Sequence, residues 1–359
     1  MITWLSFLPI DKQGFMWKKI ILSLSILFLL GLFIYREVLL YGFRQANGQF
    51  RVLWEAVPIE EKLNDASFPD SLKQKIHLVQ EIKQFAVDSL GLSPSKSYTS
   101  YFEQNGKPIL WVITACPPYS LEPKTWNFPL LGTFSYKGFF EEKLANEAIS
   151  TLQKEQMDTR KSEVSAWSTL GYLNDPILSS MLTRSEASLA SLIIHEMTHG
   201  TVFRKNDLAF NENLADFIGD YGAERYLAAK YGADNPLFKA YQQQLIDQAR
   251  YAQHIQRGSR LLDSLYRAED FKKRTDSQKK KQKEGYILQI VQTIDTLHVG
   301  SITPKRKIKQ LPNNAYFAAF ATYQSKQNEF EKEFKEKFKG DFKAYMTYLK
   351  SKYPRHRWW

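Results

Sequence analysis

Apolar residues recur at intervals of three and four along most of the chain, which is the spacing of helices with one buried face. This spacing predicts mostly helical structure over residues 44–92, helices over residues 141–157 and 237–296, and last helices over residues 314–350. The chain is therefore predicted to be an α+β protein in which helix predominates.

Strand patterns are confined to the middle of the chain. Residues 98–102 and 109–115 are rich in aromatic and β-branched residues and flank Asn105-Gly106, a dipeptide typical of a two-residue hairpin turn. Residues 164–170 are a further predicted strand. We therefore expect one small antiparallel sheet among the helices.

The most apolar stretch, residues 20–35, contains no charged residue and follows Lys18 and Lys19. A helix needs about 20 residues to cross a bilayer, so the flanking residues are required as well. We predict one N-terminal transmembrane helix within residues 17–43, preceded by a short lead of residues 1–16. This helix makes membrane lipid an expected partner.

An uncleaved signal anchor is favoured over a cleaved signal peptide, because no small-x-small cleavage site follows the apolar stretch. The positive-inside rule keeps Lys18 and Lys19 in the cytoplasm and places the rest of the chain outside it, in the periplasm. Met16 is an alternative start of translation.

Composition limits the function classes. The 24 Phe, 19 Tyr and 8 Trp favour a packed globular body, and a single cysteine excludes an intramolecular disulfide. The net charge of +11 is concentrated in basic runs within residues 272–283 and 305–309. Neither run is interleaved with aromatic residues, so a solvated helix face is the preferred interpretation of the first, and no nucleic-acid partner is expected.

The segment His195-Glu196-Met197-Thr198-His199 carries the strongest chemical signal. Two histidines four positions apart lie on one helix face and can bind one zinc ion. Glu196 is the expected general base, which takes a proton from a water molecule activated by the metal. The preceding residues 189–194 are apolar, so this helix is expected to be buried, where an uncompensated Glu would be costly.

A third ligand is expected from Glu212, thirteen positions after His199 (212 − 199), on a following helix capped by Asp207 or Asn211. Asp216, four residues after Glu212, is expected to accept the outer N–H of one histidine. The two zinc-ligand helices are predicted over about residues 185–231.

Other polar residues near these segments have weaker assignments. Asp220 and Glu224 continue the four-residue spacing and are interpreted as a solvated stripe. An activated water that attacks a carbonyl group forms a tetrahedral intermediate, which needs a further donor. Tyr172, Tyr136 and Tyr221 are candidates by their position in the sequence.

The His-Glu-x-x-His segment followed by Asn-Glu-x-x-x-Asp-x-x-Gly resembles the gluzincin metallopeptidases. Residues 165–172 and 174–179, with Phe210-Asn211-Glu212, are also similar to the bacterial family called "putative aminopeptidase". The resemblance covers nearly all of the chain after the apolar stretch. It implies a zincin-like catalytic core within residues 44–359, with a helical C-terminal part over about residues 237–350.

The same resemblance implies an activity. The chain is expected to be a membrane-anchored zinc aminopeptidase acting on peptides, with residues 164–170 holding the substrate backbone as an edge strand. A zinc endopeptidase and an inactive membrane-anchored binding or scaffold protein remain as alternatives. Glu196 argues against the second alternative, because a purely structural zinc site has no use for a base.

Overall fold

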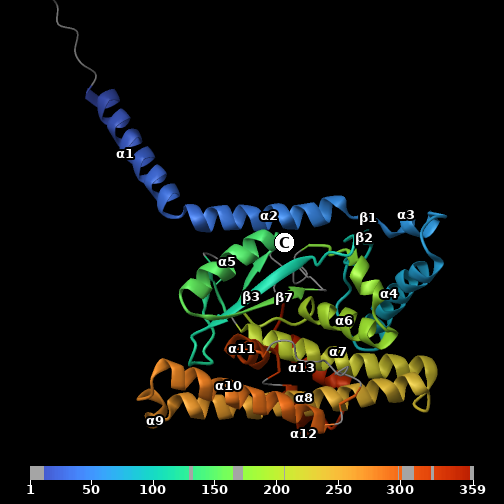
Figure 1. Cartoon of the computed structure of the whole chain (residues 1–359). Helices are drawn as coiled ribbons and strands as arrows, with labels where there is room; N and C mark the ends of the chain where they lie inside the picture. Colours follow the sequence, from blue (N-terminus) through green and yellow to red (C-terminus); the bar gives the residue numbers. More distant parts are fainter. Residues whose placement is uncertain are drawn as a thin grey trace, which may run out of the picture. The chain divides into compact units, whose positions relative to one another are not determined.

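The computed structural model describes residues 12–128, 132–164, 173–205, 207–297, 299–300, 311–324 and 327–355. The chain divides into two compact units, Met1–Phe50 and Arg51–Trp359. Figure 1 shows a predominantly helical α+β structure with small sheets, as predicted.

The first unit contains helix α1 (Lys12–Ile34) and most of helix α2 (Arg36–Glu55). The two helices meet at Tyr35 with a bend of 71°. Within the described residues, no single helix is long and apolar enough to cross a membrane, although the bent pair meets the length and composition criteria together. The single transmembrane helix predicted over residues 17–43 is therefore broken at Tyr35, next to the charged pair Arg36-Glu37.

The second unit begins with short strands and three helices. In chain order these are β1 (Val57–Pro58), α3 (Ile59–Asn64), α4 (Asp70–Asp88), β2 (Ser100–Phe102), β3 (Leu110–Cys116), β4 (Trp126–Phe128), β5 (Gly132–Phe134), β6 (Lys137–Phe139), α5 (Glu142–Lys154), β7 (Asp158–Val164), β8 (Ile177–Leu178) and the 3-10 helix η1 (Ser179–Thr183).

Helices make up the rest of the unit. They are α6 (Glu186–His199), α7 (Leu208–Tyr231), α8 (Pro236–Arg267), α9 (Glu269–Lys272), α10 (Asp276–Gln292), the 3-10 helix η2 (Thr293–Leu297), α11 (Asn314–Gln324), α12 (Gln327–Phe338) and α13 (Phe342–Lys352). The helices predicted from apolar spacing on both sides of the strand region are confirmed.

In the described part of the chain, three small sheets replace the single sheet that we expected. Strands β6-β3-β7 form an antiparallel sheet and β4-β5 an antiparallel pair. Strands β1-β2-β8 form a mixed sheet, in which β2 runs parallel to β8. Of the strand predicted over residues 164–170, only Val164 is described, as the last residue of the edge strand β7; residues 165–170 lie outside the described residues.

The predicted hairpin is wrong, although its turn is present. Asn105 and Gly106 have φ of 52° and 72°, and the Lys107 N–H donates to the Gln104 carbonyl over 3.1 Å. Strands β2 and β3 nevertheless belong to different sheets. The chain leaving β2 is bound to η1 instead, because the Gln104 N–H donates to the Ser179 hydroxyl over 3.0 Å.

Helices α6 and α7 approach each other closely at two glycines. A Cβ added at Gly219 would lie 2.8 Å from the Ser191 carbonyl oxygen and 3.2 Å from the His195 Cβ. A Cβ at Gly222 would lie 2.9 Å from side-chain atoms of Ile194. The two backbones can therefore pack at this distance only where α7 carries no side chain.

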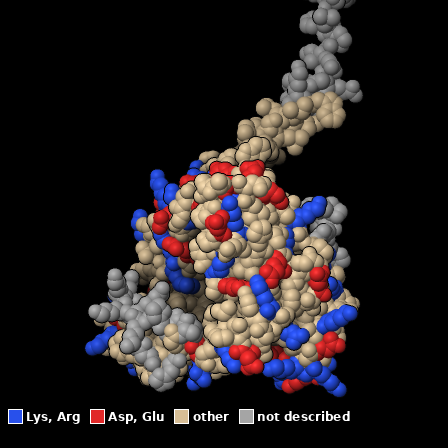
Figure 2. All heavy atoms as spheres, turned by 90° about the vertical axis from the view of Figure 1, so that its right-hand side faces the viewer, with Lys and Arg blue, Asp and Glu red and all other residues tan. Residues whose placement is uncertain are grey.

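A second core lies where α8, α10 and α11 pack around Leu262, Ile287 and Phe317. Lys283 of α10 is buried at its edge, pairs with Asp158 and donates to the Pro118 carbonyl. The interpretation of the first basic run as a solvated face is therefore wrong for Lys283. On the face shown in Figure 2, cationic and anionic side chains are intermixed.

Gly219→Ala is predicted to lower the free energy of unfolding by about 1–3 kcal/mol, because its methyl group would press on the Ser191 carbonyl. Gly285→Ala in α10 is the matched control. Its added Cβ would meet no atom within 4 Å, so the gain in helix propensity should stabilise the protein by up to about 1 kcal/mol. Denaturant unfolding of both variants measures the difference, and equal stabilities would contradict the close packing of α6 on α7.

Candidate metal centre

Helix α6 delivers the two histidines at its C-terminal end. It begins at the N-cap Ser185, whose hydroxyl accepts the Ser188 N–H over 3.2 Å, and it ends at His199, with Gly200 as C-cap. Its residues Ile193 and Ile194 are fully buried. The partial negative charge at the C-terminal end of a helix favours a cation there.

The loop after α6 is fixed by side chains that bond to the backbone. Asp207 caps α7 by accepting the Phe210 N–H over 3.0 Å. The Asn211 amide accepts the Arg204 N–H and donates to the Arg204 carbonyl, both over 2.8 Å. Of the two predicted caps, Asp207 is therefore the cap, and Asn211 secures the turn that returns the chain to α6.

His195, His199 and Glu212 converge on one point and form a group that could hold a metal ion. The Nε2 atoms of the two histidines are 3.1 Å apart. Glu212 Oε2 is 3.7 Å from His195 Nε2, and Glu212 Oε1 is 3.6 Å from His199 Nε2. Tetrahedral zinc with bonds of ~2.0–2.1 Å requires ligand atoms roughly 3.3 Å apart. The arrangement therefore fits an ion of this size with little movement.

Asp216 lies behind the first histidine. Its Oδ1 is 2.8 Å from His195 Nδ1. In neutral His195 this contact places the proton on Nδ1, so the Nε2 lone pair is directed at the point where the three side chains converge. Burial alone would lower the pKa of His195, but the hydrogen bonds to Asp216 and Glu212 outweigh it and hold that pKa well above 6.5.

The other two donors have lowered pKa values. Burial lowers the pKa of His199 to about 4, against the opposing charge of Glu212. Burial would raise the pKa of Glu212, but the hydrogen bond from His195 and the two imidazoles lower it. At pH 7 and without a metal, these directions favour a neutral His199, an ionised Glu212 and a protonated His195 between them.

Glu196 has two neighbours that the sequence did not indicate. Burial raises the pKa of Tyr98 well above 10, and the negative charge of Glu196 raises it further. Burial lowers the pKa of Arg184, and the charge of Glu196 acts in the opposite direction. Tyr98 is 2 % exposed, has a φ of 66°, and donates its N–H to the Asp175 carbonyl over 2.6 Å. Neither residue belongs to a motif, so only the folded chain brings them near Glu196.

The three tyrosines proposed as donors to the tetrahedral intermediate lie in different places. Tyr172 lies outside the described residues. Tyr136, between β5 and β6, packs edge-on against Phe134. Tyr221 stacks on Phe342 with ring centroids 4.6 Å apart.

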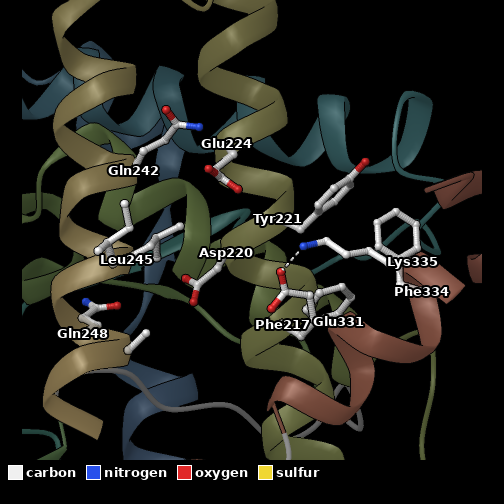
Figure 3. Close-up of a pocket in the computed structure, with 12 residues that line it drawn as sticks. Phe217, Asp220, Tyr221, Glu224, Gln242, Leu245, Gln248, Glu331, Phe334 and Lys335 are labelled. Carbon is white, nitrogen blue, oxygen red and sulfur yellow. Dashed lines mark hydrogen bonds and ion pairs between the residues drawn. The ribbon is translucent and has the colours of Figure 1, made fainter. Parts of the chain in front are cut away.

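Tyr221 also borders a hollow of about 570 Å³ between α7, α8 and α12 (Figure 3). Asp220 and Glu224 line it from the same helix, and the ion pair between Glu331 and Lys335 closes one side. The described lining includes none of the three converging metal donors.

Asp220 is a structural link between three helices. It accepts hydrogen bonds of 2.9 Å from Ser191 of α6 and from Tyr241 of α8. Burial raises the pKa of Asp220 to about 6. The interpretation as a solvated stripe is therefore wrong for Asp220, whereas Glu224 is half-buried and lines the hollow.

The family model described as "Putative aminopeptidase" matches residues 40–354, most of the chain. The chain belongs to this family, whose description is that of a peptidase. Searches of curated proteins and of solved structures returned no match. The matched range contains the three converging residues, and also Glu196 and Asp216.

Metal binding at pH 7 is predicted to release about one proton, because the ligands must be deprotonated and His195 is protonated in the metal-free protein. The apparent affinity should therefore rise with pH until the pKa of His195 is reached. Asp216→Asn removes the charge that raises this pKa, so fewer protons should be released, and the affinity should fall roughly 10–100-fold.

Titration calorimetry with Zn²⁺ in buffers of different ionisation enthalpy counts these protons. Asp234→Asn is the control, because the Asp234 side chain is fully exposed. Unchanged proton release in Asp216→Asn would show that Asp216 does not set the protonation of His195.

Proposed function

We propose that this protein is a zinc-dependent aminopeptidase of the gluzincin type, with a zincin-like catalytic core in the second unit. The observation that carries the proposal is the convergence of His195, His199 and Glu212 at distances that suit one tetrahedral ion. The family assignment supports peptide bonds as the substrate.

Zinc at this position would polarise the scissile carbonyl and lower the pKa of the attacking water. Glu196 follows His195 directly in α6 and is the proposed general base, which takes a proton from that water and later delivers it to the leaving amine. Asp216 keeps the His195 ring oriented through the contact at Nδ1. The role of the chain is to hold the donors and to move this proton.

Anchoring in a membrane by the first unit is part of the proposal. The large apolar side chains over residues 20–34 of α1 are exposed on all sides, including Leu27 at 63 % and Phe28 at 66 %, so they are suited to lipid. Lys18 and Lys19 before the apolar stretch support a cytoplasmic N-terminus and a periplasmic catalytic unit.

Glu196→Gln is predicted to retain zinc and to lose activity by roughly 100-fold or more, because the amide cannot accept the proton. Glu212→Gln is the matched variant of the same residue type, and it should lose zinc and activity together. Elemental analysis and peptide hydrolysis are measured on the same preparations. Full activity of Glu196→Gln would refute its role as base, and full zinc content of Glu212→Gln would refute its role as ligand.

An aminopeptidase binds a free α-ammonium group next to the scissile bond. We therefore predict hydrolysis of short peptides from the N-terminus and no hydrolysis of the same peptides after N-acetylation. Mass spectrometry of the products identifies the bond that is cut. Internal cleavage of the acetylated peptides would instead identify an endopeptidase, and Glu196→Gln provides the background for both substrates.

A further inference from the structure

Helix α2 (Arg36–Glu55) carries an exposed apolar stripe. Leu39, Phe43, Phe50 and Trp54 follow one another at intervals of four, seven and four residues, which keeps them on one helix face. Their exposed fractions are 48 %, 72 %, 66 % and 91 %. Side chains of this size are rarely exposed together without a partner.

From this stripe we infer that α2 lies in the membrane interface, with the stripe buried in lipid and the helix axis along the membrane plane. The inference rests on the proposed anchoring by α1 and is independent of peptidase activity. The stripe on α2 would then be a second lipid-binding surface, next to the apolar residues 20–35.

The continuity of α2 with α1 indicates that lipid covers the apolar stripe. Only Tyr35 separates the two helices, and residues 20–34 of α1 include no charged residue. A segment that enters a bilayer brings the next helix to its surface, and the 71° bend turns α2 away from the α1 axis. The stripe then continues the apolar surface of α1 around the bend.

Length supports the same arrangement. Residues 20–35 form an uncharged stretch of sixteen positions (35 − 20 + 1), which spans about 24 Å as a helix. This is less than the ~30 Å of the hydrocarbon core. A helix that sinks about 5–10 Å into the headgroup boundary reduces the thickness that α1 must cross.

Charge beside the stripe is also suitable. Arg44 and Arg51 each follow a stripe residue directly, so they lie about 100° further round the helix, on one side. Both are exposed. Their guanidinium groups can reach lipid phosphates while the neighbouring aromatic rings remain in the apolar layer.

Nitroxide labels on the full-length chain in vesicles of phosphatidylethanolamine and phosphatidylglycerol test this inference. Phe43→Cys and Phe50→Cys place labels on the stripe, and Arg44→Cys and Arg51→Cys are matched controls beside it. The native Cys116 is fully buried, which raises the pKa of its thiol to about 12, so it should not react with the label. Unmutated protein measures any residual labelling.

Power-saturation EPR compares collisions of each label with oxygen, which concentrates in lipid, and with a water-soluble nickel chelate. We expect the oxygen-to-nickel ratio to be several-fold higher at positions 43 and 50 than at 44 and 51. Equal ratios in protein that floats with the vesicles would overturn the inference while leaving the anchor intact. Dipolar broadening at 43 and 50 would identify a second copy of the chain as the occupant and would also overturn it.

Flotation in a density gradient tests membrane binding separately from peptidase activity. Failure of the whole chain to float would overturn both the anchor and the interfacial helix. Peptide hydrolysis by the same preparation reports on the metal centre alone.

Discussion

The close packing of α6 against α7 is the constraint on which the candidate metal centre depends. His195 and His199 share a face of α6 because they are four residues apart. Glu212 reaches them because α7 packs closely on α6. Gly219 of α7 allows this approach at Ser191, one turn before His195 in α6. The loop fixed by Asp207 and Asn211 then determines the level at which α7 begins.

The charges of the three converging side chains also favour a cation at this position. Two imidazole nitrogens and a carboxylate face one another in a buried space, an arrangement that requires a positive charge. In the metal-free protein the raised pKa of His195 supplies it as a proton. A divalent cation can take the place of that proton, while Asp216 remains bonded to the opposite side of the ring.

Local geometry explains how much of this could be predicted from the sequence. The helices follow from the spacing of apolar residues, and the shared histidine face follows from a four-residue interval. Glu212 could be proposed because a helix end, a cap and a second helix fit into thirteen positions. The structure brings it to the histidines, but its role as a ligand is still a proposal.

Features that depend on tertiary contacts could not be predicted. The turn at Asn105-Gly106 forms locally, yet β2 pairs with β1 and with β8, which lies far along the chain, and not with β3. Asp220 and Lys283 have the spacing of exposed residues, but Asp220 accepts a hydrogen bond from Tyr241 of α8 and Lys283 pairs with Asp158. Tyr98 reaches the surroundings of Glu196 only through the fold.

X-ray absorption at the zinc edge, with elemental analysis of the purified full-length protein, tests the central claim most directly. We expect one zinc per chain, nitrogen and oxygen ligands at about 2.0–2.1 Å, and outer-shell scattering from two imidazoles. Protein that binds no zinc when it is supplied, or zinc with a sulfur ligand at about 2.3 Å, would contradict it.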